Sequence, residues 1–186
     1  MASAGQKGHV LVVAATEREL DPVEEARTVV CGIGPVEAAV ATARALAEER
    51  PSAVLHVGIA GARGLEPLTL VLGTEAVYCD AAGPLVPALA LPDGDLLAAL
   101  HEAFPEAVLR SIGTSARVGG SHGTDVEAME GFAVLRACEL AEVPAVEVRV
   151  VSNAIGEPDR ALWRFDDAFA LLAETLPRLV AVASGR

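Results

Sequence analysis

The sequence contains few aromatic residues, since Phe, Trp and Tyr make up only 3% of its 186 residues. A hydrophobic core must therefore be built mainly from Ala, Val and Leu. Hydrophobic residues nevertheless account for 52% of the chain, which excludes a disordered protein, because this much apolar surface can offset the loss of chain entropy. The length matches one domain, since domains commonly span about 100–200 residues. We expect a flexible N-terminus over residues 1–8 and a single domain over residues 9–186.

Positive charge is also scarce, with 14 Lys and Arg against 26 Asp and Glu and a formal net charge of −12. This balance argues against binding to nucleic acid or to an anionic membrane, because phosphate groups are repelled. It also disfavours a reaction that consumes free phosphate. A small ligand whose charges are paired locally remains compatible with it.

Long apolar runs are missing, since no uninterrupted stretch approaches the roughly 20 residues of a membrane span. The first eight residues lack the apolar segment of a signal peptide. The three cysteines, Cys31, Cys79 and Cys138, form no CxxC pair and no cluster with histidines. We therefore expect reduced thiols, a cytoplasmic location, no metal site and no cofactor.

Short Val-rich apolar segments alternate with segments in which apolar residues recur at helical spacing. Strands are predicted at residues 9–15, 27–31, 53–57, 68–72, 75–80, 108–114 and 145–152. Helices are predicted from Pro35 to before Pro51 and at residues 96–104, 126–142 and 164–182. Asp125 is expected to cap the third helix, and Pro177 to kink or restart the last. This alternation predicts an α/β domain with a largely parallel central sheet.

Ligands bind such sheets at the carboxyl ends of the strands. Four predicted loops lie there, at residues 16–19, 58–62, 115–124 and 153–159. Gly58 and Gly61 could let the backbone approach a ligand closely, although a plain turn explains them equally well. Gly32 and Gly34 are explained by a tight turn, because position 37, where a dinucleotide fingerprint needs glycine, is Glu. The Gly- and Ser-rich loop 115–124 is expected to be mobile.

Three polar residues are candidates for chemistry at this edge. Glu19 follows a buried strand, although a solvated loop charge is the ordinary alternative. Glu130 follows Met129, which fits an apolar stripe, so it borders a buried face and is either functional or an ordinary surface residue. Asn153 ends the last predicted strand and offers two donors and one acceptor group, although asparagines there commonly serve as turn residues or caps.

The other polar candidates are expected to be structural. Arg149 lies inside the last predicted strand, so it must be paired, and either Glu147 or Glu130 could pair with it. His56 is expected to be a core histidine and His122 a loop residue, with no metal or triad role.

Five segments, in this order, resemble the purine nucleoside phosphorylase and methylthioadenosine/S-adenosylhomocysteine nucleosidase superfamily. They are VVAATEREL (12–20), GIGPVEAAVATARA (32–45), VLHVGIAGA (54–62), VEAMEGFA (126–133) and PAVEVRVVSN (144–153). Within it, the chain is most similar to the futalosine hydrolases. The similarity rests on Met129-Glu130-Gly131, on Ser152-Asn153 and on the stretch from Glu157 to Arg164.

The resemblance implies a single three-layer α/β domain with a mixed, largely parallel sheet, and a purine nucleosidase that releases hypoxanthine from futalosine for menaquinone biosynthesis. It implies that Glu19 activates the attacking water and that Glu130 binds the ribose hydroxyls, with Met129 packed against the sugar. Asn153 is implied to face the leaving base, and Ile59 to flank the ribose and base. A homodimer or higher homo-oligomer is also implied.

Two alternatives remain open at this stage. One is a methylthioadenosine/S-adenosylhomocysteine nucleosidase, against which Asn153 counts. The other is a nucleoside-binding protein without catalysis, against which both Glu19 and Glu130 count. The aromatic residue that stacks on the base is not assigned, with Phe132, Tyr78 and Trp163 as candidates.

Overall fold

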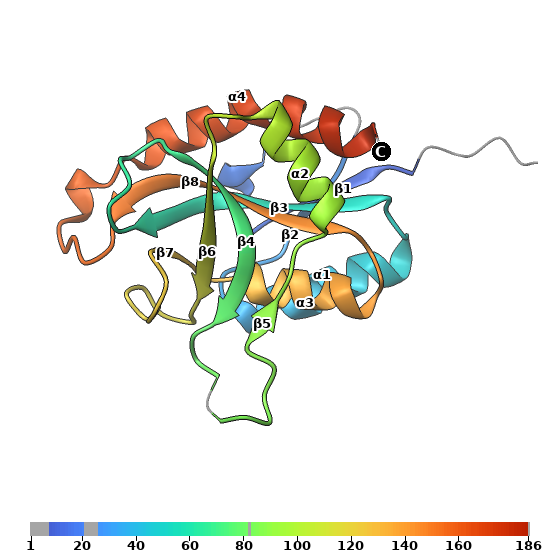
Figure 1. Ribbon diagram of the computed structural model, residues 1–186, viewed down its shortest axis with the longest axis horizontal. Helices are drawn as coiled ribbons and strands as arrows, with labels where there is room; N and C mark the ends of the chain where they lie inside the picture. Colours follow the sequence, from blue (N-terminus) through green and yellow to red (C-terminus); the bar gives the residue numbers. More distant parts are fainter. Residues whose placement is uncertain (1–7, 21–25, 82, 186) are drawn as a thin grey trace, which may run out of the picture.

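The computed structural model describes residues 8–20, 26–81 and 83–185 (Figure 1). Residues 1–7 of the expected flexible N-terminus lie outside the described residues. One eight-stranded sheet has the order β2-β1-β3-β7-β6-β4-β5, and β8 pairs with both β3 and β4. Its strands are β1 (Val10–Ala14), β2 (Ala26–Val30), β3 (Ala53–Ala62), β4 (Leu70–Tyr78), β5 (Leu89–Ala90), β6 (Val108–Thr114), β7 (Val126–Ala128) and β8 (Ala145–Ala154).

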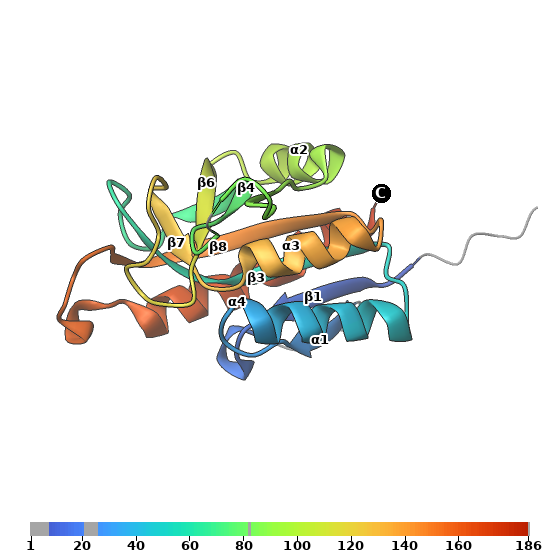
Figure 2. The same cartoon turned by 90° about the horizontal axis from the view of Figure 1, so that it is seen from below.

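Helices cover both faces of this sheet, as Figures 1 and 2 show. The helices are α1 (Pro35–Glu48), α2 (Gly94–Ala103), α3 (Gly131–Leu140) and α4 (Phe165–Ser184), with short 3-10 turns η1 (Glu17–Glu19) and η2 (Arg160–Leu162). α1 packs with α3 on one face, and α2 packs with α4 on the other. The expected three-layer α/β architecture is therefore confirmed.

The sheet is mixed, with parallel pairing along its centre. β1 pairs in parallel with β2 and β3, and β3 pairs in parallel with β8. β7 runs antiparallel to β3, and β4 runs antiparallel to β5 and β8. Because helices cover both faces, β1 and nearly all of β8 are buried, which explains the continuous apolar sequence of β1.

Two predicted boundaries around glycines are wrong. Residues 58–62 are not a loop but the second half of β3, which is held by β8 along its length. The two strands expected at 68–72 and 75–80 are one strand, β4, with an irregularity between Gly73 and Glu75. In both cases pairing with a neighbouring strand continues on both sides of the glycine. This pairing involves residues distant in the sequence, so the local sequence does not predict it.

The helix predicted over residues 126–142 is also wrong at its start. Residues 126–128 form β7, which pairs with β6 and β3, and α3 begins only at Gly131. The cap position belongs to Glu130 rather than Asp125. α4 does not restart at Pro177 but continues to Ser184, because its apolar residues pack on the sheet on both sides of that proline. Among the described residues, no helix is both long and apolar enough to cross a membrane.

Candidate active site

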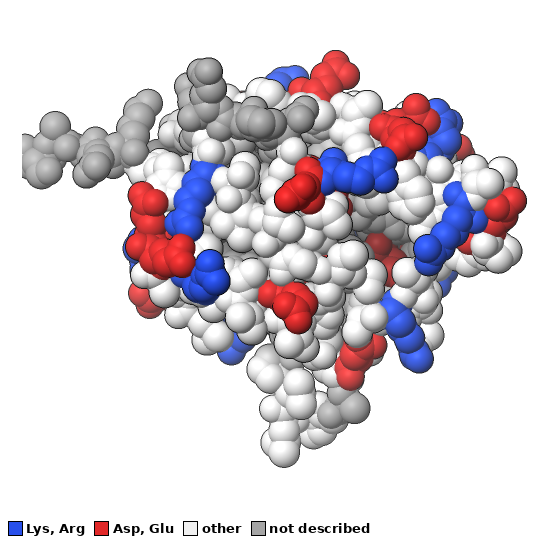
Figure 3. All heavy atoms as spheres, turned by 180° about the vertical axis from the view of Figure 1, so that it is seen from behind, with Lys and Arg blue, Asp and Glu red and all other residues white. Residues whose placement is uncertain are grey.

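A cavity of about 280 Å³ opens at the carboxyl ends of β1, β3 and β8. Each of the four segments that the sequence analysis placed at the strand ends contributes to its wall, through Glu19, Ile59, Val118 and Asn153 among others. The face seen in Figure 3 is hollowed, and acidic side chains are visible inside the hollow. The expectation that a ligand site lies at this edge is consistent with that cavity.

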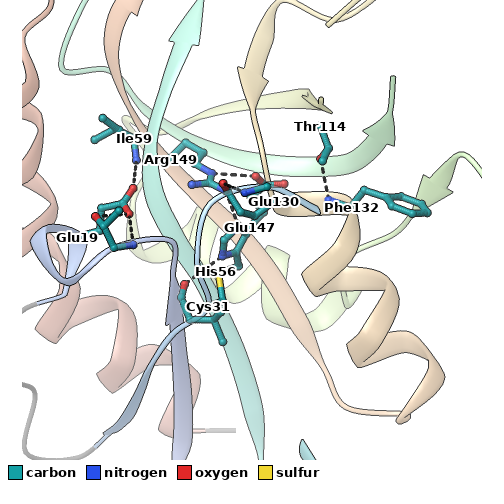
Figure 4. Close-up of polar contacts among 12 residues, drawn as sticks. Glu19, Cys31, His56, Ile59, Thr114, Glu130, Phe132, Glu147 and Arg149 are labelled. Atoms are coloured by element: carbon teal, nitrogen blue, oxygen red, sulfur yellow. Dashed lines mark hydrogen bonds and ion pairs between the residues drawn. The ribbon is translucent and has the colours of Figure 1, made fainter. Parts of the chain in front are cut away.

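Glu19 is fixed in the cavity wall by three hydrogen bonds. Its Oε2 accepts from the backbone N–H of Thr16 at 2.9 Å and from the Thr16 hydroxyl at 3.0 Å. Its Oε1 accepts from the backbone N–H of Ile59 at 3.3 Å, a contact drawn in Figure 4. Glu19 is only 7% exposed, so it is not the solvated loop charge that was the ordinary alternative.

Glu130 approaches the same cavity from the start of α3. Its Oε1 accepts a hydrogen bond from the backbone N–H of Gly34 at 3.0 Å, and its Oε2 lies 3.6 Å from Arg149 Nη2. Burial raises the pKa of Glu130, while the charge of Arg149 lowers it. Gly34 has a φ of 97°, which glycine adopts readily. The tight turn predicted at Gly34 therefore also places a backbone N–H beside the Glu130 carboxylate.

Arg149 is buried and paired, as the sequence required, and it pairs with both acids considered. Its Nε donates to Glu147 Oε1 at 2.8 Å, and its Nη2 faces both Glu130 and His56 Nε2 (Figure 4). His56 is the expected core histidine, with its Nδ1 3.0 Å from the carbonyl oxygen of Val13. Burial, followed by the charge of Arg149, holds the pKa of His56 well below its usual value, so the ring is neutral.

Asn153 and Met129 complete the set of predicted residues at the cavity. The Oδ1 of Asn153 accepts from the Ser152 hydroxyl at 2.8 Å, and its Nδ2 donates to the carbonyl of Ala154 at 3.1 Å. Those contacts use one of the two amide hydrogens, which leaves the other for a ligand. The structure therefore brings Glu19, Ile59, Met129, Glu130 and Asn153 to one cavity.

The three aromatic residues considered for stacking on the base lie in two different places. Tyr78 and Phe132 stack on each other with their ring centroids 5.0 Å apart, and they line a groove between α1 and α3 instead of the cavity. Trp163 does line the cavity, together with Phe165 and Phe169 of α4, which sequence reasoning missed. The Trp-Arg-Phe sequence at the start of α4 was the available signal for that aromatic wall.

Glu127 is a further cavity residue that sequence reasoning missed. Its carboxylate accepts from the backbone N–H of Gly119 at 2.5 Å and from the N–H and hydroxyl of Ser121 at 2.9 and 2.8 Å. It thereby ties loop 115–124 to β7. Glu127 was not predicted as a site residue because the sequence analysis placed it in a helix over residues 126–142, and such a helix does not bring Glu127 beside this loop. Across residues 8–20, 26–81 and 83–185, no cluster of His, Cys, Asp or Glu could hold a metal ion.

The three cysteines are expected to differ in their reactivity toward thiol reagents. Burial raises the pKa of Cys31 and Cys138 to about 12, with the charge of Glu130 adding to the effect at Cys31. At pH 8 both thiols should stay protonated and unreactive. We expect a maleimide to label native protein only at the less buried Cys79 and to label all three cysteines after unfolding, as measured by mass spectrometry. Native Cys79→Ser protein should remain unlabelled, and modification of Cys31 there would contradict this picture.

The sequence over residues 21–183 matches the family model of the phosphorylase superfamily. The chain belongs to the phosphorylase superfamily. Within that superfamily it is 32% identical over 181 residues to a futalosine hydrolase of Thermus thermophilus, covering 83% of this chain and 80% of that enzyme. A futalosine hydrolase of Acidothermus cellulolyticus is also 32% identical, with 77% and 73% covered. A match to the Streptomyces coelicolor futalosine hydrolase has 39% identity but spans only 43% of that protein.

Solved structures of nucleosidases share the fold. A methylthioadenosine/S-adenosylhomocysteine nucleosidase from Colwellia psychrerythraea, in complex with adenine, has a TM-score of 0.81 and 22% identity, covering 97% of this chain and 96% of that one. The Helicobacter pylori nucleosidase has a TM-score of 0.82 and 16% identity, with 94% and 98% covered. The predicted superfamily, fold class and enzyme class, a hydrolase of N-glycosyl bonds, are confirmed by these matches.

Proposed function

We propose that this protein hydrolyses the N-ribosidic bond of futalosine and releases hypoxanthine. The coarser function, a purine nucleosidase, follows from the superfamily and the relatives. The observation that carries the finer proposal is the convergence of two buried carboxylates, Glu19 and Glu130, and one amide, Asn153, on a single cavity. The predicted homodimer or higher oligomer remains a prediction.

Cleavage of an N-ribosidic bond passes through a sugar with oxocarbenium character, as in glycoside hydrolysis. In the proposed mechanism, Glu19 orients a water molecule and accepts its proton as the water attacks C1 of the ribose. Its hydrogen bonds to Thr16 and Ile59 hold the carboxylate in place before substrate binds. Glu130 binds the ribose hydroxyls, and its negative charge stabilises the positive charge that develops on the sugar.

Water is favoured over phosphate as the nucleophile by the charges around the cavity. Glu19 lies in the turn after β1 and lines the cavity, where its carboxylate repels phosphate. Arg149 lines the cavity, but Glu147 and Glu130 already engage its guanidinium. A phosphorylase needs available cationic groups at this place.

Asn153 supports a 6-oxopurine as the leaving base. Hypoxanthine presents N7 and O6, both acceptors, whereas adenine presents N7 and an amino donor. An amide N–H facing these atoms stabilises the base as it takes the electron pair of the broken C1–N9 bond, and the base then gains a proton from solvent to become neutral hypoxanthine, while Glu19 returns its proton to solvent. The amide oxygen can also pair with adenine.

Replacement of Asn153 by Asp tests this assignment. The carboxylate repels O6 of hypoxanthine and accepts from the amino group of adenine. We expect kcat/KM for futalosine to fall about 10- to 100-fold, which corresponds to one directed base contact of about 1–3 kcal/mol. In the same variant, kcat/KM for adenine release from methylthioadenosine should rise relative to kcat/KM for futalosine. An equal loss on both substrates would contradict the role given to Asn153.

The experiment for the function itself is base release from purified protein without added phosphate. Futalosine, inosine and methylthioadenosine are supplied in parallel, and the products are separated by chromatography. Hypoxanthine from futalosine alone supports the proposal. Adenine from methylthioadenosine would instead favour the adenosine-type nucleosidase, and no release from any nucleoside would favour a binding protein without catalysis.

A further inference from the structure

Glu147 is a buried carboxylate that the proposed reaction does not use directly. It lies within β8 with 0% of its surface exposed, and its Oε1 accepts from Arg149 Nε at 2.8 Å. Within the described part of the chain, its Oε2 has no hydrogen-bond partner. Because burial of a carboxylate is unfavourable, the single bond to Arg149 is the contact that can account for its position.

The start of α3 is shaped around this side chain. A methyl group added to Gly131 would overlap both carboxylate oxygens of Glu147. Gly131 is the first residue of α3 and does not have a positive φ, so its backbone does not require glycine. Alanine is the better helix former at such a position. The presence of glycine at position 131 is therefore explained by the Glu147 carboxylate, which occupies the space that a Cβ would fill.

Glu147 and His56 hold the Arg149 guanidinium along one edge, through its Nε and Nη2 respectively. On its other side, Nη2 stays 3.6 Å from Glu130 Oε2, whereas a charge-assisted hydrogen bond closes to about 2.8 Å. Arg149 therefore lends positive charge to Glu130 without closing a bidentate pair. Glu130 keeps acceptor capacity for a ligand.

The guanidinium also lies close to the second carboxylate of the cavity. A Cβ built on Gly58 would overlap Arg149 Nη1 and lie 2.6 Å from Glu19 Oε1. Gly58 thus opens the space in which Arg149 approaches Glu19, and Figure 4 shows the guanidinium between Glu19 and Glu130. A small rotation of this one group would change the surroundings of both carboxylates.

We infer that Glu147 is a positioning residue, which by binding Arg149 Nε keeps the guanidinium back from Glu130 and leaves the Glu130 carboxylate available to the ribose hydroxyls. The inference rests on the proposed function, because that proposal assigns Glu130 to the ribose. Without the bond to Glu147, the guanidinium turns onto Glu130 as a bidentate ion pair and competes with the substrate for its oxygens.

Two variants of Glu147 and one control test this role. Glu147→Met keeps the length but removes the acceptor, and we expect kcat/KM to fall by about 100-fold, mainly through a higher KM. Glu147→Gln should retain most of the activity, because its amide oxygen still accepts from Arg149 Nε. Val148→Ala, at an equally buried position on the opposite face of β8, should lose stability while keeping its kcat/KM.

Gly131→Ala provides an independent check of the same contact. In the wild-type background its methyl group displaces the Glu147 carboxylate, so it should reproduce the KM increase. In a Glu147→Ala background it should add little, because the group it would overlap is gone. Equal effects in the two backgrounds would show that Gly131 does not act through Glu147 and would count against the inference.

A crystal structure of Glu147→Met separates this inference from the proposed function. We expect both Nη atoms of Arg149 within about 3 Å of the Glu130 oxygens. If the wild-type protein releases no base from any nucleoside, the proposed function fails, and this geometry still decides whether Glu147 positions Arg149. If the guanidinium has not moved, or if Glu147→Met in an active enzyme matches Val148→Ala in kcat/KM, the inference is overturned.

Discussion

Replacement of Glu19 by Gln should reduce kcat by about 10³-fold, within the range of about 10²- to 10⁴-fold that general-base catalysis contributes. The amide cannot take a proton from water at neutral pH. Its oxygen can still accept from Ile59 or Thr16, so the turn after β1 should keep its structure. Ligand affinity, measured by calorimetry, should therefore change little while turnover is lost.

Glu17→Gln is the matched control for this experiment. Glu17 belongs to the same 3-10 turn as Glu19 but is exposed to solvent. Its substitution removes the same charge from the same turn and should leave kcat within about twofold of the wild-type value, since surface charges outside a site contribute little. A Glu19→Gln enzyme with full turnover, or an equal loss in Glu17→Gln, would rule out Glu19 as the base.

Replacement of Arg149 by Met should lower the free energy of unfolding by about 3–5 kcal/mol. The substitution leaves two buried carboxylates, Glu130 and Glu147, without the cation that both of them face. Arg44→Met is the control, because Arg44 makes an exposed ion pair with Glu48 on α1. Its loss should cost less than about 1 kcal/mol. Urea unfolding of the three proteins measures the difference.

The destabilisation by Arg149→Met should depend on pH. Burial raises the pKa of Glu130 and of Glu147 in the folded protein, and Arg149 opposes this shift at both groups. In its absence both pKa values rise further. Between the ordinary glutamate pKa and the raised values, the folded state binds more protons than the unfolded state, so stability falls as pH increases. We expect a smaller loss at pH 5 than at pH 8, and an equal loss at both would contradict burial of charged carboxylates.

Elements whose signals are local could be predicted from the sequence. β6 was predicted with its observed bounds, and α1 begins at Pro35 as expected, because proline suits the first helical turn. The burial of β1 was visible as an uninterrupted apolar run. These features depend on residues that are neighbours in the chain.

Features that depend on distant partners could not be predicted in the same way. β7 is three residues long and exists because β3 and β6 lie on either side of it. Because β7 was not predicted, the hydrogen bonds between Glu127 and loop 115–124 were not predicted either. The position of Arg149 inside a predicted strand indicated that it needs a carboxylate, and both candidate acids face it in the structure. The contact between Glu147 and Gly131 could not be predicted, because it depends on how α3 packs against β8.

Several residues that line the cavity had been named from the sequence as candidates. Residue type and the rule that ligands bind at the carboxyl ends of parallel strands pointed to Glu19 and Asn153, and the resemblance supplied their implied roles. The cavity brings both residues together with Glu130, although nothing in their spacing along the sequence places them side by side. The aromatic wall from α4 was not anticipated, because it depends on how that helix packs over the end of the sheet.

In the proposed reaction water, and not phosphate, attacks the sugar in this cavity. The most direct test identifies the sugar product by mass spectrometry after futalosine is incubated with the enzyme, with and without added phosphate. We expect a free sugar in both reactions and a rate of hypoxanthine release that phosphate does not increase. A sugar 1-phosphate, or base release that requires phosphate, would contradict it.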